Sequence, residues 1–165
     1  MSVGTMSERG ELTDPTVRFL VFELDAQPYA LPLAAVERIE RAVAVTPLPN
    51  PVEYVLGIVN LRGEIIAVLD IRKRFSLPER QIDLDDRLIV ARTRHRKVAL
   101  VVNGVSDVIE RREQDIISSE GILPGLTYVK GVMKLDDGLI LIHDLNSFLA
   151  FEEEADLNEA IERHE

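Results

Sequence analysis

The chain contains two copies of one pattern, and this duplication constrains the fold more than any other feature. The segment YVLGIVNLRGEIIAVLDIRKRF, residues 54–75, aligns without a gap on YVKGVMKLDDGLILIHDLNSFL, residues 128–149, at an offset of 74. Upstream segments that begin at Phe19 and Leu88 align in the same way at an offset of 69. A longer loop in the second copy, near residues 117–126, absorbs the difference. The chain is therefore predicted to repeat one unit of about 65 residues.

Both copies consist of short apolar runs separated by turn residues. FLVFEL, EIIAVLDI, RLIVAR, KVALVV and LILIHDL are rich in β-branched residues or Leu, which is typical of strands. About five strands per copy would leave open edges in a flat sheet, and closure into a small barrel removes them. The predicted fold class is mostly β, with two tandem five-stranded SH3-like β-barrels and short helices.

The repeat boundaries divide the chain into four parts. They are a flexible N-terminal tail at residues 1–17, a first barrel at 18–83, a second barrel at 84–150 and an acidic C-terminal tail at 151–165. Leu157 and Ile161 of the last part have helical spacing.

Charge and composition disfavour several function classes. The formal charge of −10 opposes binding to a phosphate backbone, so nucleic acid is not an expected partner. The absence of Cys excludes disulfides, thiol catalysis and Cys-based zinc sites. The first residues lack a signal-peptide pattern, and no apolar stretch is long enough to span a membrane, so we expect a cytoplasmic protein without direct membrane insertion.

The residues that could perform chemistry do not form a recognisable active site. Asp70 and Asp144 each follow an apolar run and precede a short helical pattern, so helix capping is favoured over a pair of catalytic carboxylates. His95, His143 and His164 lack the spacing of metal ligands. We therefore predict no catalytic residues, no metal, no cofactor and no enzyme activity.

Two turns and the flanking segments remain as candidate binding surfaces. Gly63 is expected to serve a tight turn, whereas Arg62 has no counterpart in the second copy and is the better candidate for function. The basic run Arg92–Lys97 is interpreted as a solvated hairpin tip rather than a phosphate site. Residues 36–40 and 104–108 either flank a groove between the lobes or join the lobes together, and the sequence leaves both alternatives open.

Several motifs in the same order resemble the CheW family of bacterial chemotaxis adaptors over residues 18–150. They are FLVFELDAQPYALPL, TPLPNPVEYVLGIVNLRGEIIAVLDIRKRF, VALVVNGVSDVIE and YVKGVMKLDDGLILIHDL. The resemblance implies a non-catalytic scaffold that couples chemoreceptors to the histidine kinase CheA. It also implies that the receptor's cytoplasmic helical hairpin tip lies along the inter-lobe groove and that the kinase's regulatory domain is a second partner. Such an adaptor is expected to be a monomer in isolation and to join membrane receptor arrays with its partners.

The resemblance also assigns residues to each partner. The positions that match receptor coupling in the family are Val36, Gly57, Asn60, Leu61, Arg62, Val105 and Val108. Leu56 and Ile65 match the neighbourhood that contacts the kinase. Arg38 departs from the family pattern, in which an acidic residue is often found at this position. An adaptor of the same fold in a non-motility pathway, such as pilus or biofilm control, is the alternative.

Overall fold

The computed structural model describes residues 5–6, 12–13, 15–49, 52–122, 128–136, 138–147 and 161. The first copy of the repeat forms β3 (Thr16–Leu24), β4 (Gln27–Pro32), η1 (Leu33–Ala35), β5 (Val36–Arg41), β6 (Val55–Leu61), β7 (Glu64–Leu69) and α1 (Ile71–Arg74). The second copy forms β8 (Arg87–Arg92), β9 (Lys97–Val102), β10 (Gly104–Arg112), η2 (Glu113–Asp115), β11 (Ile117–Ser118), η3 (Ser119–Gly121), β12 (Val129–Leu135), β13 (Gly138–His143) and η4 (Leu145–Ser147). No helix in these ranges is long and apolar enough to cross a membrane.

The predicted duplication and the mostly-β fold class are confirmed. Strands β12 and β13 begin 74 residues after β6 and β7, at the offset found in the sequence. The short helix α1 and the 3-10 helix η4 follow the last strand of their respective copies. The two copies therefore fold alike, except that β11 of the second copy corresponds to an isolated bridge in the first.

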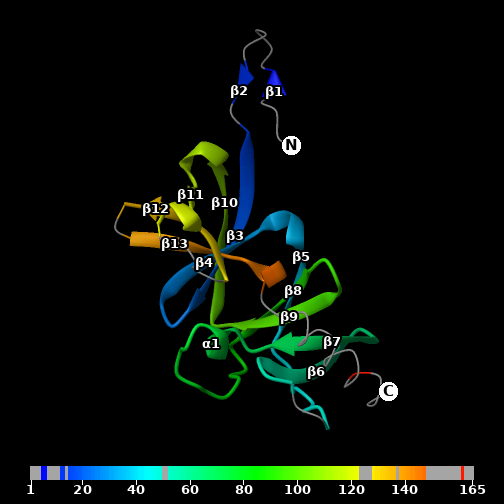
Figure 1. Ribbon diagram of the computed structural model, residues 1–165. Coiled ribbons are helices and arrows are strands. Elements are labelled where there is room, and N and C mark those ends of the chain that lie inside the picture. Colours follow the sequence, from blue (N-terminus) through cyan, green and yellow to red (C-terminus); the bar gives the residue numbers. More distant parts are fainter. Residues whose placement is uncertain are drawn as a thin grey trace.

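The two copies exchange strands to form two sheets (Figure 1). One sheet has the order β10-β3-β4-β13-β12-β11, so the first hairpin of copy one lies among strands of copy two. The other has the order β5-β8-β9-β7-β6, with the β8–β9 hairpin of copy two among strands of copy one. The predicted division at residues 83 and 84 separates the repeats but not the sheets. An alignment of repeats identifies which residues correspond, and it does not say which copy each strand pairs with.

The exchanged hairpins are buried on both faces. On one face, residues of β3–β4 and β8–β9 meet in the largest core, which includes Phe22, Leu31, Ile89 and Leu100. Their alternate residues fill the interiors of the two sheets, in separate clusters. Burial on both faces explains why FLVFEL, RLIVAR and KVALVV are continuous apolar runs rather than alternating ones.

The continuous strand ladders are open, and short pairings link their outer edges. The chain beyond β5 returns to β6 through the isolated bridge between Thr46 and Ile58. The chain beyond β10 passes through η2 into β11, which pairs with β12. The prediction of two closed five-stranded barrels is therefore corrected in detail: the sheets have six and five strands, their ladders are open, and only these short pairings connect their edges.

The N-terminal tail contains more structure than the sequence indicated. Strands β1 (Thr5–Met6) and β2 (Leu12–Thr13) pair in an antiparallel hairpin that stands away from the two sheets (Figure 1). Strand β3 already begins at Thr16. The predicted C-terminal tail, residues 151–165, lies outside the described residues except for Ile161.

Candidate protein-interaction site

The turn between β6 and β7 displays Arg62. Leu61 pairs with Glu64, which leaves Arg62 and Gly63 as a two-residue turn with φ values of +56° and +86°. Positive φ at both positions is the pattern of a type I′ turn, which matches the twist of the strands. The Gly63 N–H donates to Asn60 Oδ1 at 2.8 Å. Asn60 therefore holds the turn, and the turn directs a side chain that is 77% exposed into solvent.

Arg62 belongs to a cluster of charges at the outer side of β5. The cluster consists of three acidic and three basic residues: Glu37, Arg38, Glu40, Arg62, Glu64 and Lys97. Arg62 Nη2 lies 3.3 Å from Glu40 Oε1. Arg38 lies within 4.0 Å of three acids, at 2.7 Å from Glu37, 3.8 Å from Glu40 and 3.9 Å from Glu64. Arg38 thus shares Glu40 with Arg62. Arg38 is also the residue that the resemblance identified as a departure from the family pattern.

Lys97 joins two acidic residues of the charged cluster. Its Nζ lies 3.0 Å from carboxylate oxygens of both Glu37 and Glu64. The hydrogen bonds that Lys97 donates to these two carboxylates raise the pKa of Lys97, and the one to Glu37 lowers the pKa of Glu37. Exposed ion pairs add little to stability, so the cluster serves mainly to orient its side chains. Lys97 also ends the predicted basic hairpin tip, which the structure confirms as the turn between β8 and β9.

Gly57 and Leu61, both assigned to receptor coupling by resemblance, are buried. A Cβ atom at Gly57 would lie 2.2 Å from the carbonyl oxygen of Thr46, and its φ is +152°. Leu61 packs inside the five-stranded sheet. Gly57 has no side chain and that of Leu61 is buried, so any effect of these positions on binding would act through the shape of β6.

Val36 and Val105 correspond in the repeat and pack against the same core. Both are half-buried against the cluster between the exchanged hairpins. Of the two alternatives left open for their segments, these side chains join the sheets together. Val108, on β10 of the six-stranded sheet, is exposed instead. The structure therefore groups Asn60, Arg62 and the charged cluster, and it places Val105 and Val108 in the other sheet.

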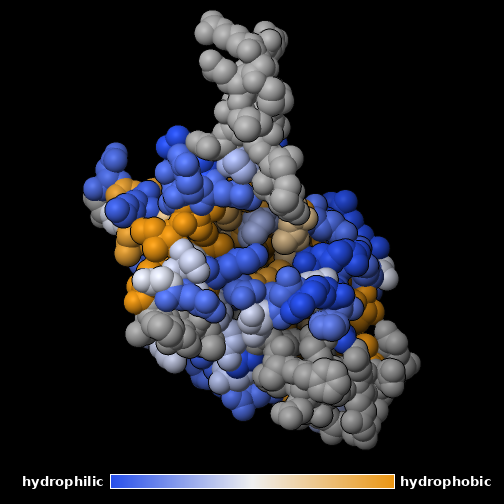
Figure 2. Space-filling model, turned by 45° about the horizontal axis from the view of Figure 1, so that its top comes forward, coloured by the Kyte–Doolittle hydropathy of each residue, from blue (hydrophilic) through white to orange (hydrophobic). Residues whose placement is uncertain are grey.

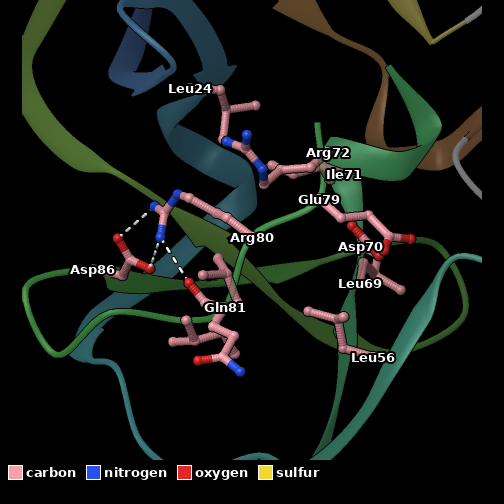
Figure 3. A pocket seen from close by; sticks show the side chains of 12 residues that line it. Leu24, Leu56, Leu69, Asp70, Ile71, Arg72, Glu79, Arg80, Gln81 and Asp86 are labelled. Atoms are coloured by element: carbon pink, nitrogen blue, oxygen red, sulfur yellow. Dashed lines mark hydrogen bonds and ion pairs between the residues drawn. The ribbon is translucent and has the colours of Figure 1, made fainter. Parts of the chain in front are cut away.

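Leu56 and Ile65, which match the kinase-contact neighbourhood, are exposed apolar residues at 38% and 42%. Leu56 borders a pocket of about 460 Å³. In Figure 3, Leu56 lies on one side of this pocket and the Arg80–Asp86 pair on the other. Leu69 and Ile71 contribute apolar surface to the lining of the pocket.

The guanidinium groups at this pocket are already paired. Arg80 donates to both carboxylate oxygens of the buried Asp86, at 2.7 and 3.0 Å. Arg72 donates to both oxygens of Asp25 at 2.7 Å and also to the Pro78 carbonyl. Because these cations are committed to protein acids, the pocket suits an apolar side chain better than an anionic ligand.

Apolar surface is also exposed at the end of the six-stranded sheet. Figure 2 shows hydrophobic residues gathered at the left of the view, near β11, β12 and β13, beside a polar central region. Exposed side chains of these elements and their connections are Ile117, Ile122, Leu135 and Leu139. No motif in the sequence points to a role for these residues.

The Asp and His residues behave as structural groups. Asp70 caps α1, since its Oδ1 accepts from the Lys73 N–H at 3.0 Å, which confirms the capping prediction. Asp144 accepts from the Ser147 hydroxyl at 2.6 Å. His143 is 1% exposed and lies edge-on to Phe75, and burial lowers its pKa to about 4. The described ranges contain no group of three or more His, Cys, Asp or Glu residues that could hold a metal.

An Arg–Tyr contact joins the two copies, and it was not predicted from the sequence. The Arg74 guanidinium lies over the Tyr54 and Tyr128 rings, 3.6 and 4.5 Å from their centroids, and donates to the Tyr128 hydroxyl at 3.0 Å. The two Tyr residues share a positive φ, and their carbonyls accept from the Asp70 and Asp144 N–H groups at 2.8 Å. The aligned Tyr pair was a signal, but Arg74 itself is not repeated.

Comparison with known proteins agrees with this geometry. A CheW-like domain model matches residues 18–153. The chain is 32% identical over 134 residues to the chemotaxis protein CheW of Bacillus subtilis, which covers 80% of this chain and 86% of that protein. It is 28% identical over 144 residues to the CheW of Rhizobium meliloti, covering 86% and 93%.

A solved structure has the same fold. The crystal structure of the scaffolding protein TtCheW from Thermoanaerobacter tengcongensis superposes with a TM-score of 0.74 at 31% identity, covering 84% of this chain and 96% of that one. Family model, relatives and fold agree over the same region, and the chain is therefore a member of the CheW-like domain family.

Proposed function

We propose that the chain is a non-catalytic chemotaxis adaptor that binds a chemoreceptor and the histidine kinase CheA at the same time. The receptor contact is its cytoplasmic helical hairpin tip, and the kinase contact is the regulatory domain. The adaptor works in the cytoplasm and is recruited to membrane receptor arrays by these partners. The relatives are named as chemotaxis proteins, which favours chemotaxis over a non-motility pathway.

The observation that carries the proposal is the display of Arg62. A locked two-residue turn holds its guanidinium out in solvent, where Glu40 is its ion-pair partner at 3.3 Å. A cation on a fixed backbone suits a partner with an acidic or amide-bearing surface, because the turn has little backbone entropy left to lose on binding. The exposed Leu56 and Ile65 on the same hairpin provide the apolar contact that a second partner needs.

Two surfaces on one rigid body would allow signal transfer without chemistry. A receptor that changes shape would alter its contacts with the adaptor and so shift the kinase between active and inactive populations. Repeated linkage in an array raises the effective concentration of each contact, so individual contacts can be weak.

The proposal is tested by Arg62→Ala in a calorimetric titration with a receptor hairpin fragment. We expect binding to weaken by about 1–3 kcal/mol while the melting temperature stays unchanged. Arg94→Ala is the matched control, since Arg94 is an exposed Arg on the neighbouring β8–β9 turn. Equal receptor affinity for the wild-type and Arg62→Ala proteins would remove Arg62 from the site.

A further inference from the structure

The outer face of the β6–β7 hairpin carries apolar residues that are covered from outside. Val59 and Ile66 point into the five-stranded sheet. Side chains alternate along a strand, so their neighbours Ile58 and Ala67, which pair across the hairpin, point outward. Outward residues at an edge hairpin would ordinarily face solvent, yet Ile58 and Ala67 are only 3% and 2% exposed.

Two segments cover this face. Leu48 and Val52, which precede β6, pack on Ile58 and Ala67, and Ile161 packs against the same cluster. Ile161 lies beyond the residues matched by the CheW-like domain, which end at 153. The cover is therefore completed by a side chain from outside the shared domain.

The covered patch continues into an exposed apolar residue of the same hairpin. Ile65 precedes Ala67 by two positions on β7 and lies on the same face, opposite Asn60. Leu56 lies at the register shift between Val55 and Gly57 of β6 and borders the pocket instead, so Ile65 is the exposed apolar residue of this face. Ile161 thus occupies one end of a face whose other end is open.

We propose that Ile161 is an internal competitor for the partner that binds the β6–β7 face. A partner that contacts Ile65 would extend its apolar contact onto the part of this face that Ile161 covers, but only after Ile161 has left. The apparent affinity equals the intrinsic affinity multiplied by the fraction of molecules in which Ile161 has left the face. The identity of that partner, the regulatory domain of the kinase, rests on the proposed function.

The first test asks whether Ile161 occupies the face in solution. In the full-length chain with labelled methyl groups, nuclear Overhauser contacts are expected between Ile161 and the methyl groups of Ile58 and Ala67. The Ile161→Asp variant should shift the Ile58 and Ala67 methyl resonances while distant methyl groups stay unchanged. Absence of these contacts in the wild-type protein would overturn the proposal.

The second test measures affinity for a fragment of the kinase regulatory domain. Removal of a half-buried Ile competitor should raise the affinity on the order of fivefold to tenfold. Ile161→Ala is measured beside Ile161→Asp, because the smaller change keeps the test valid if Asp lowers stability. Leu84→Asp is the matched control, since Leu84 is an apolar residue that is already 86% exposed.

The possible results separate this proposal from the function on which it rests. Equal or weaker binding by both Ile161 variants, with binding by the wild-type protein intact, would overturn the competitor role alone. No binding by the wild-type protein or any variant would overturn the proposed kinase contact and the competitor role with it. Tighter binding by both Ile161 variants, but not by Leu84→Asp, supports the proposal.

Discussion

Replacement of Gly57 by Ala should destabilise the chain more than any comparable change at another described glycine. The new Cβ would lie 2.2 Å from the Thr46 carbonyl oxygen and 2.8 Å from Val45 Cγ1. The oxygen belongs to the backbone, so the clash is relieved only if the segment around Thr46 moves away from β6. That movement breaks the bridge that links the two edges of the five-stranded sheet.

The size of the expected loss in stability follows from the interactions that this movement breaks. The bridge holds two hydrogen bonds of 2.9 Å, from Thr46 N–H to the Ile58 carbonyl and from Ile58 N–H to the Thr46 carbonyl. Each contributes about 1 kcal/mol. The φ of +152° adds about 1–3 kcal/mol for a residue with a side chain. Ala also restricts the unfolded chain, which stabilises the folded state by about 0.4–1 kcal/mol. The net loss in the free energy of unfolding is therefore about 3 kcal/mol.

Calorimetric or urea unfolding of three variants measures this effect. A net loss of this size should lower the melting temperature by about 6–12 °C in a chain of this length. Gly131→Ala, whose Cβ would approach the Ile117 carbonyl oxygen at 2.9 Å, should lose less. Gly104→Ala meets nothing within 4 Å and is the control.

A Gly57→Ala protein as stable as Gly104→Ala would refute the packing argument. The same reasoning explains why Gly57→Asp is expected to impair receptor coupling although Gly57 is buried. The larger side chain displaces β6 and therefore the Arg62 turn that β6 ends in.

Two further perturbations test the interior. Because burial holds the pKa of His143 near 4 against 6.5 when unfolded, only the unfolded chain binds a proton between these values. Stability should therefore fall by about 3 kcal/mol as the pH drops from 6.5 to 4, and His143→Leu should remove this part of the pH dependence in urea titrations. Arg74→Ala should lower the free energy of unfolding by about 1–2 kcal/mol through loss of its contacts with Tyr54 and Tyr128. Arg74→Lys should recover only part of this stability, because a Lys ammonium lacks the planar group that stacks on the two Tyr rings. Full recovery of the stability by Lys would contradict a role for stacking.

The sequence predicted the local structure well, because local structure depends on neighbouring residues. Apolar runs located the strands, Gly63 located a turn, and Asp70 was identified as a cap. The duplication also predicted that two similar units form. Each of these inferences needs only short-range pattern or internal comparison.

The arrangement between units was not predictable in the same way. Whether the β3–β4 hairpin pairs with its own copy or the other one depends on the total core buried, to which both copies contribute similar strands. The contacts of Arg62 with Glu40, and of Arg74 with Tyr128, join residues far apart in the chain. Ile161 was recognised by its spacing, but its place on the β6–β7 face required the structure.

The central claim is that one rigid body holds two proteins at once and performs no reaction. Sedimentation velocity on the full chain, mixed with a receptor hairpin fragment and a fragment of the CheA regulatory domain, tests it most directly. The account predicts a species that contains all three components, formed without any change in the covalent structure of its members. Binding in which each fragment displaces the other from the chain would contradict it.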